Sequence, residues 1–192
     1  MIRRLYDWTL AWAAHPRALW VLAAVAFVES SVFPIPPDIL LIPMVLATPR
    51  RAWLIALTCT LASVAGGLAG YAIGAFAWEG LGEPILRALG KAGSFDAFFA
   101  RYNEWGAWAV LIAGITPFPY KVVTILSGAT GLSLPIFVVS SIVARGLRFF
   151  VVAALLRRFG PPVQAFVEER LGLAFTAFVV LLVGSFAALR YV

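Results

Sequence analysis

The sequence is poor in charge and nearly devoid of cysteine and histidine. Charged residues make up 12% of its 192 residues, and Cys59 and His15 are the single cysteine and the single histidine. Soluble domains carry about 25% charged residues. One cysteine excludes an intrachain disulfide framework and a multi-cysteine metal site. We interpret Cys59, which lies in an apolar run, as a small buried hydrophobe, and His15 as an interfacial rather than a catalytic side chain.

Hydrophobic residues, by contrast, make up 62% of the chain. This composition predicts an integral membrane protein with one membrane domain over residues 1–192 and no room for a soluble domain of ordinary size. The formal net charge of +6 is typical of cytoplasmic loops that face anionic lipid head groups. The basic residues are dispersed and form no binding motif, which argues against a nucleic-acid partner.

The stretch "VESSVFPIPPDILLIPMVL", residues 28–46, interrupts an apolar segment with prolines and acids. The apolar segments before and after the prolines are each shorter than the ~20 residues that a helix needs to span a bilayer, and proline ends helices. Two interpretations stay open, a single kinked span or a re-entrant hairpin over 18–48. The flanking arginines favour the hairpin, because it keeps all of them on the cytoplasmic side. These arginines are Arg3, Arg4, Arg17, Arg50 and Arg51, and the hairpin tip carries Pro34, Pro36 and Pro37.

A second interruption, "GITPFPYKVV", predicts a second re-entrant hairpin that enters from the opposite face of the membrane. This hairpin covers 107–132, with Pro117 and Pro119 at its tip. Long, mainly apolar runs predict transmembrane helices over 53–78, 135–156 and 173–189. Residues 1–17 are expected to form an interfacial helix and 79–106 an external amphipathic segment. The predicted fold class is an all-α integral membrane protein. Its two opposed hairpins and about three transmembrane helices form an inverted repeat.

Small residues recur every four positions in the predicted helix 53–78. Gly66, Gly70 and Gly74 fall on one helical face. A small-xxx-small face lets another helix approach closely, so we expect this face to be a packing surface rather than a binding site.

Five ionisable residues fall in the predicted membrane interior, where such residues are rare and usually functional. They are Glu29, Asp38, Lys121, Arg145 and Arg148. The two arginines are three residues apart and therefore share a helix face. One hypothesis is structural: the acids neutralise the arginines and hold the first hairpin in place. The other is a substrate or proton pathway, because irregular backbone at depth is tolerated where it lines a cavity, and arginine binds phosphate bidentately.

Three motifs follow one another between residues 29 and 150: "ESSVFPIPPD", "GITPFPYKVVTILSGATG" and "SSIVARGLRFF". Together they resemble the DedA family, also called SNARE-associated or VTT-domain proteins, and most closely its small YqaA-like branch. The resemblance implies lipid transport, with undecaprenyl phosphate or a phospholipid as substrate and dependence on the proton motive force. It also implies that Glu29 and Asp38 match the functional acids of the first hairpin. The commoner family pattern has an arginine on each side of the second hairpin's proline, where this chain has Ile115 or Thr116 and then Lys121.

The predicted function is therefore a membrane transporter and not an enzyme. It would move a lipid or lipid phosphate by its anionic head group, with protons as the candidate coupling ion and with no cofactor or metal. Two alternatives stay open: a small-ion or proton-coupled solute transporter, and a non-transporting membrane-homeostasis protein. An intramembrane enzyme would need a histidine at depth, a metal-ligand cluster or a P-loop, none of which the sequence offers. The expected location is the bacterial cytoplasmic membrane, and a homo-oligomer stays open.

Overall fold

A computed structural model describes residues 17–33, 36–82, 84, 92–116 and 118–160, and within these ranges every regular element is helical. In chain order the elements are α2 (Ala18–Ser31), α3 (Asp38–Ala47), the short 3-10 helix η1 (Pro49–Arg51), α4 (Ala52–Ala77), the π-helical turn η2 (Trp78–Gly82), α6 (Ala92–Ile115), α7 (Tyr120–Ala129) and α8 (Leu134–Phe159). The prediction of an all-α fold is confirmed for this part of the chain. The helices predicted at 1–17 and 173–189 lie outside the described residues, apart from Arg17.

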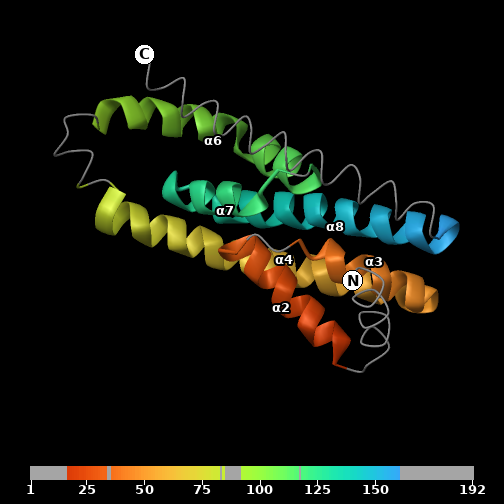
Figure 1. Ribbon diagram of the computed structural model, residues 1–192. Helices are drawn as coiled ribbons and strands as arrows, with labels where there is room; N and C mark the ends of the chain where they lie inside the picture. Colours follow the sequence, from red (N-terminus) through yellow and green to blue (C-terminus); the bar gives the residue numbers. More distant parts are fainter. Residues whose placement is uncertain (1–16, 34–35, 83, 85–91, 117, 161–192) are drawn as a thin grey trace, which may run out of the picture.

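Helices α4 and α8 run along the length of the molecule (Figure 1). Each has 26 residues, about 39 Å of helix, and both are long and apolar enough to cross a bilayer. They correspond to the predicted helices 53–78 and 135–156. Helix α8 buries Ser140, Ser141 and Arg145, whereas Val139 and Leu147 are exposed. Apolar side chains outside and polar ones inside are the pattern expected of a helix that faces lipid.

The glycine face of α4 brings two other helices into close contact with its backbone, as the sequence predicted. A Cβ atom on Gly66 would overlap the backbone of Phe27 on α2, and one on Gly74 would overlap the backbone of Ile125 on α7. Gly70, between them, lies against the Thr124 side chain. These small residues therefore set how closely α2 and α7 approach α4.

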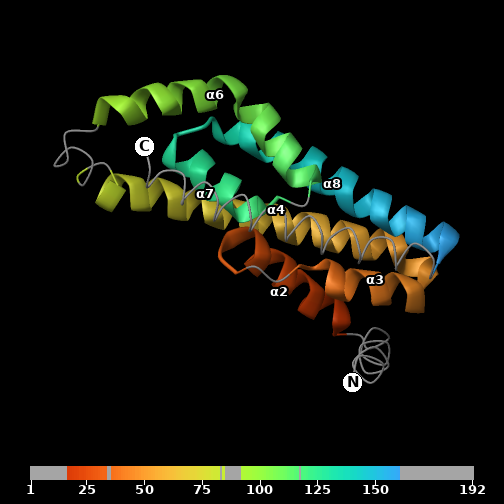
Figure 2. The same cartoon turned by 45° about the horizontal axis from the view of Figure 1, so that its top comes forward.

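The break between α2 and α3 falls at the predicted proline cluster. The backbone N–H groups of Val32 and Phe33 both donate to the carbonyl oxygen of Val28, and Pro37 is the N-cap of α3. Proline is well accepted at a helix start, where its missing N–H costs nothing. Figures 1 and 2 place both helices on the side of α4 that is remote from α6. Helix α2 meets α4 at Gly66 through Phe27 and at Gly70 through Ser30, near its own end, so the break lies within the length of a membrane-length helix.

The second broken segment has a longer first arm than predicted. Helix α6 runs continuously through the boundary that the sequence placed at 106–107, so the segment 79–106 and the hairpin 107–132 share one helix. The sequence changes from charged to apolar at this point, but the helix continues through it. The change in composition therefore does not mark a helix end. Gly106 continues the helix, and its missing side chain leaves room for Leu132. The chain reverses after Thr116 and returns as α7.

Candidate functional site

Arg145 and Glu29 form an ion pair between α8 and α2. Arg145 Nη2 donates to Glu29 Oε2 at 2.8 Å, although the two residues are 116 positions apart in the chain. The Arg145 side chain is fully buried, and 13% of the Glu29 side chain is exposed. Both helices pack on α4, which brings the two charges together.

Two serines close a hydrogen-bonded ring around this ion pair. Arg145 Nε donates to Ser63 Oγ on α4 at 2.6 Å, which leaves the Ser63 hydroxyl to donate to Ser30 Oγ, also at 2.6 Å. The Ser30 hydroxyl donates in turn to Glu29 Oε2 at 3.0 Å. Because a guanidinium can only donate, each hydrogen bond in the ring has one direction, and two of them end on the same carboxylate oxygen. The ring therefore suits an ionised Glu29.

The Arg145 guanidinium also contacts two aromatic rings. Its Cζ lies 4.7 Å from the ring centres of both Tyr120 on α7 and Phe149 on α8, within the range of a cation–π interaction. The Tyr120 hydroxyl donates to Ser141 Oγ, which fixes the tyrosine ring. Nη1 of Arg145 is buried without a hydrogen-bond partner among the described residues. A buried donor without an acceptor is costly, so this nitrogen is the unsatisfied group of the site.

A second ion pair joins α8 to α3. Arg148 Nη2 donates to Asp38 Oδ2 at 2.6 Å, and both side chains are largely buried, with 12% and 3% of their surfaces exposed. Asp38 is the first residue of α3, where the partial positive charge of the helix N-terminus also favours a carboxylate. The acids that flank the first proline cluster are thus each paired with one of the two arginines of α8.

The two broken segments converge on these ion pairs. Thr124 on α7 donates to the backbone carbonyl oxygen of Ser30 at 3.1 Å, which joins the second segment to the end of α2. Tyr120, the first residue of α7, lies against Arg145. Both proline breaks therefore place their helix ends beside the same charged cluster.

The structure describes four of the other residues predicted for the site, which are Lys121, Pro36, Pro37 and Pro119. Lys121, in the first turn of α7, is partly buried and forms no ion pair within the described ranges. Of the tip prolines, Pro36 is exposed, Pro37 is buried and Pro119 is partly buried as the N-cap of α7. Pro34 and Pro117 lie outside the described residues.

Sequence reasoning missed the uncharged members of the site, which are Ser30, Ser63, Tyr120 and Thr124. Ser63 did carry a signal, because it lies three residues before Gly66 on the packing face of α4. Ser30 adjoins Glu29, and Tyr120 adjoins Lys121. Hydroxyl groups on a packing face beside charged residues are therefore candidates for the same network.

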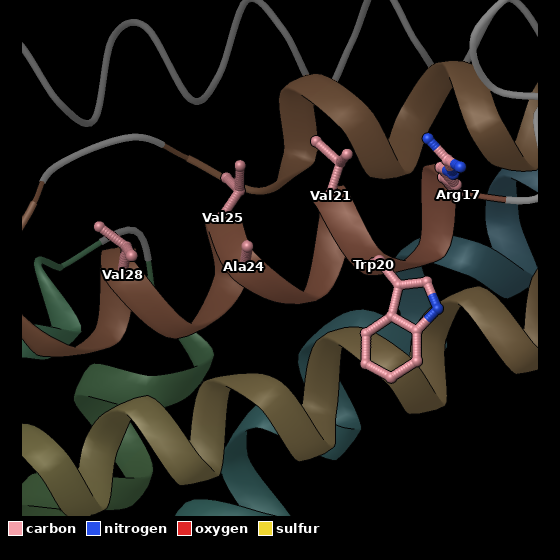
Figure 3. A pocket seen from close by; sticks show the side chains of 6 residues that line it. All are labelled: Arg17, Trp20, Val21, Ala24, Val25 and Val28. Atoms are coloured by element: carbon pink, nitrogen blue, oxygen red, sulfur yellow. The ribbon is translucent and has the colours of Figure 1, made fainter.

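An open apolar groove of about 680 Å³ follows the outer face of α2, separate from the charged cluster (Figure 3). It begins at Arg17 and ends at Val28, the residue before Glu29, and Trp20, Val21, Ala24 and Val25 line it between these ends. No member of either ion pair lines it. A surface of this kind suits hydrocarbon chains and not a charged ligand.

An apolar outer surface, two helices of membrane length and ion pairs in the interior are typical of a helical membrane protein. The chain belongs to the VTT-domain family, also called the DedA or SNARE-associated family: the VTT domain matches residues 35–158. The family predicted from the three sequence motifs is thereby confirmed. Asp38, Lys121, Arg145 and Arg148 lie inside the matched region, and Glu29 lies before it.

Two bacterial relatives are similar over most of their length. An uncharacterized protein of Haemophilus influenzae is 36% identical over 186 residues, which cover 97% of this chain and 96% of the relative. A protein of Histophilus somni, described as an uncharacterized homologue of HI0703, is 32% identical over 151 residues, 79% of this chain and 78% of the relative. No solved structure matches the chain.

Proposed function

We propose that this protein translocates an anionic lipid across the bilayer, with the head-group phosphate passing the arginines inside the helical bundle. The observation that carries the proposal is that Arg145 keeps a buried Nη1 without a partner while it is paired with Glu29. Guanidinium groups bind phosphate oxygens through parallel N–H donors, and here the N–H donors of Nη1 have no partner among the described residues. Undecaprenyl phosphate and phospholipids, the substrates that the family resemblance implies, both offer this chemistry.

The charges of the cluster favour an anion. The two ion pairs balance two positive charges against two negative ones, and Lys121, which follows Tyr120 in α7, is proposed to add a third positive charge to the cluster. The surplus of one positive charge in a poorly solvated region is relieved when an anion binds. We propose that the two acids gate the site or carry protons, so that transport depends on the proton gradient.

The broken segments are proposed to enter the bilayer from opposite faces as re-entrant hairpins. The contact of Ser30 with Thr124, near the middle of α4, supports this arrangement. Helix ends in the membrane interior leave backbone N–H groups unpaired within the helix, and such groups favour anions. We further propose that the protein works in the bacterial cytoplasmic membrane and belongs to the YqaA-like branch of the family.

Reconstitution in lipid vesicles tests the function directly. Purified protein is inserted into vesicles that contain fluorescently labelled polyprenyl phosphate, phosphatidylglycerol or phosphatidylcholine, and the label remaining on the outer leaflet is bleached chemically. We expect faster movement of at least one anionic lipid than in protein-free vesicles. Equal rates with and without protein for every lipid would refute the proposal.

The variant Asp38→Asn is expected to slow lipid movement by roughly tenfold to a hundredfold. The loss of a charge-assisted hydrogen bond costs about 1.5–3 kcal/mol, and it leaves Arg148 without its carboxylate. The matched control is Glu79→Gln, which neutralises an exposed acid on η2 and should leave the rate unchanged. If Asp38→Asn instead abolished uptake of a soluble substrate while lipid movement stayed normal, the protein would be a solute transporter.

A further inference from the structure

The groove on the outer face of α2 has a cation at one end and apolar side chains along the rest of its length. Its lining residues are Arg17, Trp20, Val21, Ala24, Val25 and Val28. Figure 3 shows Arg17, Val21, Val25 and Val28 pointing to the same side of the helix, whereas Trp20 points to the other side. Ala24, whose side chain is the smallest of the six, lies between the valines. The groove is therefore a narrow apolar strip that begins at a guanidinium.

The length of the groove matches the thickness of one leaflet of a bilayer. From Arg17 to Val28 the helix rises about 16 Å. The hydrocarbon core of a bilayer is about 30 Å thick, so one leaflet contributes about 15 Å. Trp20, in the first turn of α2, is 78% exposed, and tryptophan is enriched at the head-group layer. With Arg17 at the level of the lipid phosphates, Val28 lies near the middle of the bilayer.

We infer that the groove binds one anionic phospholipid, with its phosphate on Arg17 and one hydrocarbon chain along Val21, Ala24, Val25 and Val28. The inference goes beyond the proposed function, because this site lies outside the charged cluster and a lipid can occupy it without crossing the membrane. A guanidinium carries five N–H donors and binds phosphate oxygens in pairs, so Arg17 can hold a phosphate beside its other interactions.

Charge complementarity selects an anionic head group. Arg17 is exposed and is the charged residue among the six that line the groove. Arg50 and Arg51 on η1, directly before α4, are exposed as well, and Figures 1 and 2 place the starts of α2 and α4 toward the same end of the bundle. The positive-inside rule assigns such an end to the cytoplasmic side, whose leaflet carries anionic lipids. A zwitterionic lipid would gain the hydrocarbon contact without the net attraction.

Native mass spectrometry on the full chain tests the inference. The protein is stripped of lipid in detergent and titrated with phosphatidylglycerol or with phosphatidylcholine of the same chain length. We expect saturable binding of phosphatidylglycerol, roughly fivefold tighter than that of phosphatidylcholine, which is the contribution of one arginine near a membrane surface. Equal binding of both lipids without saturation would show an ordinary lipid-facing surface and would overturn the inference.

Two variants of the groove have matched controls, and all four substituted residues are exposed. Arg17→Gln should abolish the preference for phosphatidylglycerol, whereas Arg50→Gln, the same change at another exposed arginine, should keep it. Ala24→Trp should fill the groove and abolish saturable binding, whereas Ala65→Trp on α4 should not. The inference would be wrong if the members of either pair behaved alike.

The variant Glu29→Gln/Arg145→Gln separates this site from the charged cluster. It removes the interior ion pair but no residue of the groove, so it should still bind phosphatidylglycerol, even where lipid translocation fails. Binding that is lost in this variant and survives in Arg17→Gln would place the lipid inside the bundle and contradict the inference.

The other occupants of an apolar groove give different results in the same samples. If Ala24→Trp converted a dimer into a monomer in light scattering, the groove would be an interface with a second copy of the chain, and the inference would fail. The absence of saturable lipid binding to the wild type would overturn it as well, whether a second copy or another part of the chain then covers the groove.

Discussion

Replacing Arg145 with glutamine is expected to lower the free energy of unfolding by about 3–5 kcal/mol. The change removes the cation of a buried ion pair and leaves the Glu29 carboxylate largely shielded from water without its partner. It also removes the donor to Ser63 and the group that lies against the rings of Tyr120 and Phe149. Unfolding in mixed micelles, followed by circular dichroism as the fraction of sodium dodecyl sulfate rises, measures the loss.

The double variant Glu29→Gln/Arg145→Gln is the matched control for this loss. Removing both charges of a buried pair is often nearly neutral, whereas removing one is strongly destabilising. We therefore expect the double variant to regain most of the stability that the single variant loses. If the two single changes were additive in the double variant, the pair would not be coupled in the folded protein.

Gly74→Ala is expected to destabilise the protein by about 3 kcal/mol, although alanine is the better helix former. Its added methyl group would overlap the backbone of Ile125 on α7, and backbone cannot move aside as a flexible side chain can. Helices α4 and α7 must then separate, which also disturbs the contact of Thr124 with Gly70 and Ser30. The same unfolding titration in mixed micelles measures the effect.

Gly146→Ala is the matched control for Gly74→Ala. Gly146 also lies within a long helix, α8, but a Cβ atom there would come no closer than 3.8 Å to its nearest neighbour, the methyl group of Thr60. We expect unchanged stability or a gain of up to about 1 kcal/mol from helix propensity. Equal effects of the two substitutions would show that close packing at Gly74 does not hold α7 in place.

Local signals in the sequence predicted the elements well. The prolines at 36, 37 and 119 end or begin helices because their rings fix φ and remove a backbone donor, and this effect needs no knowledge of distant residues. The membrane-length helices α4 and α8 followed from long, mainly apolar runs, and the glycine face of α4 from its four-residue spacing. The acids Glu29 and Asp38 were candidates for the site because they are charged residues in an apolar segment, which is also a local signal.

Pairings across the fold could not be derived in this way. Which acid meets which arginine depends on how α2, α3 and α8 pack around α4, since more than a hundred residues separate the partners. The sequence also gave no sign that α6 continues past Gly106, because composition reports the environment of a helix and not its end. Ser63 was overlooked because a serine in a membrane helix is common, and only its contact with Arg145 makes it part of the site.

The central claim is that Arg145 and Glu29 serve lipid movement and do not merely neutralise each other. The most direct measurement is the rate of anionic-lipid translocation in vesicles that contain the double variant Glu29→Gln/Arg145→Gln, which is expected to be stably folded. We expect this rate to fall to that of protein-free vesicles, because the phosphate has lost its guanidinium. A folded double variant that moves lipid as fast as the wild type would contradict the claim and leave the ion pair with a structural role alone.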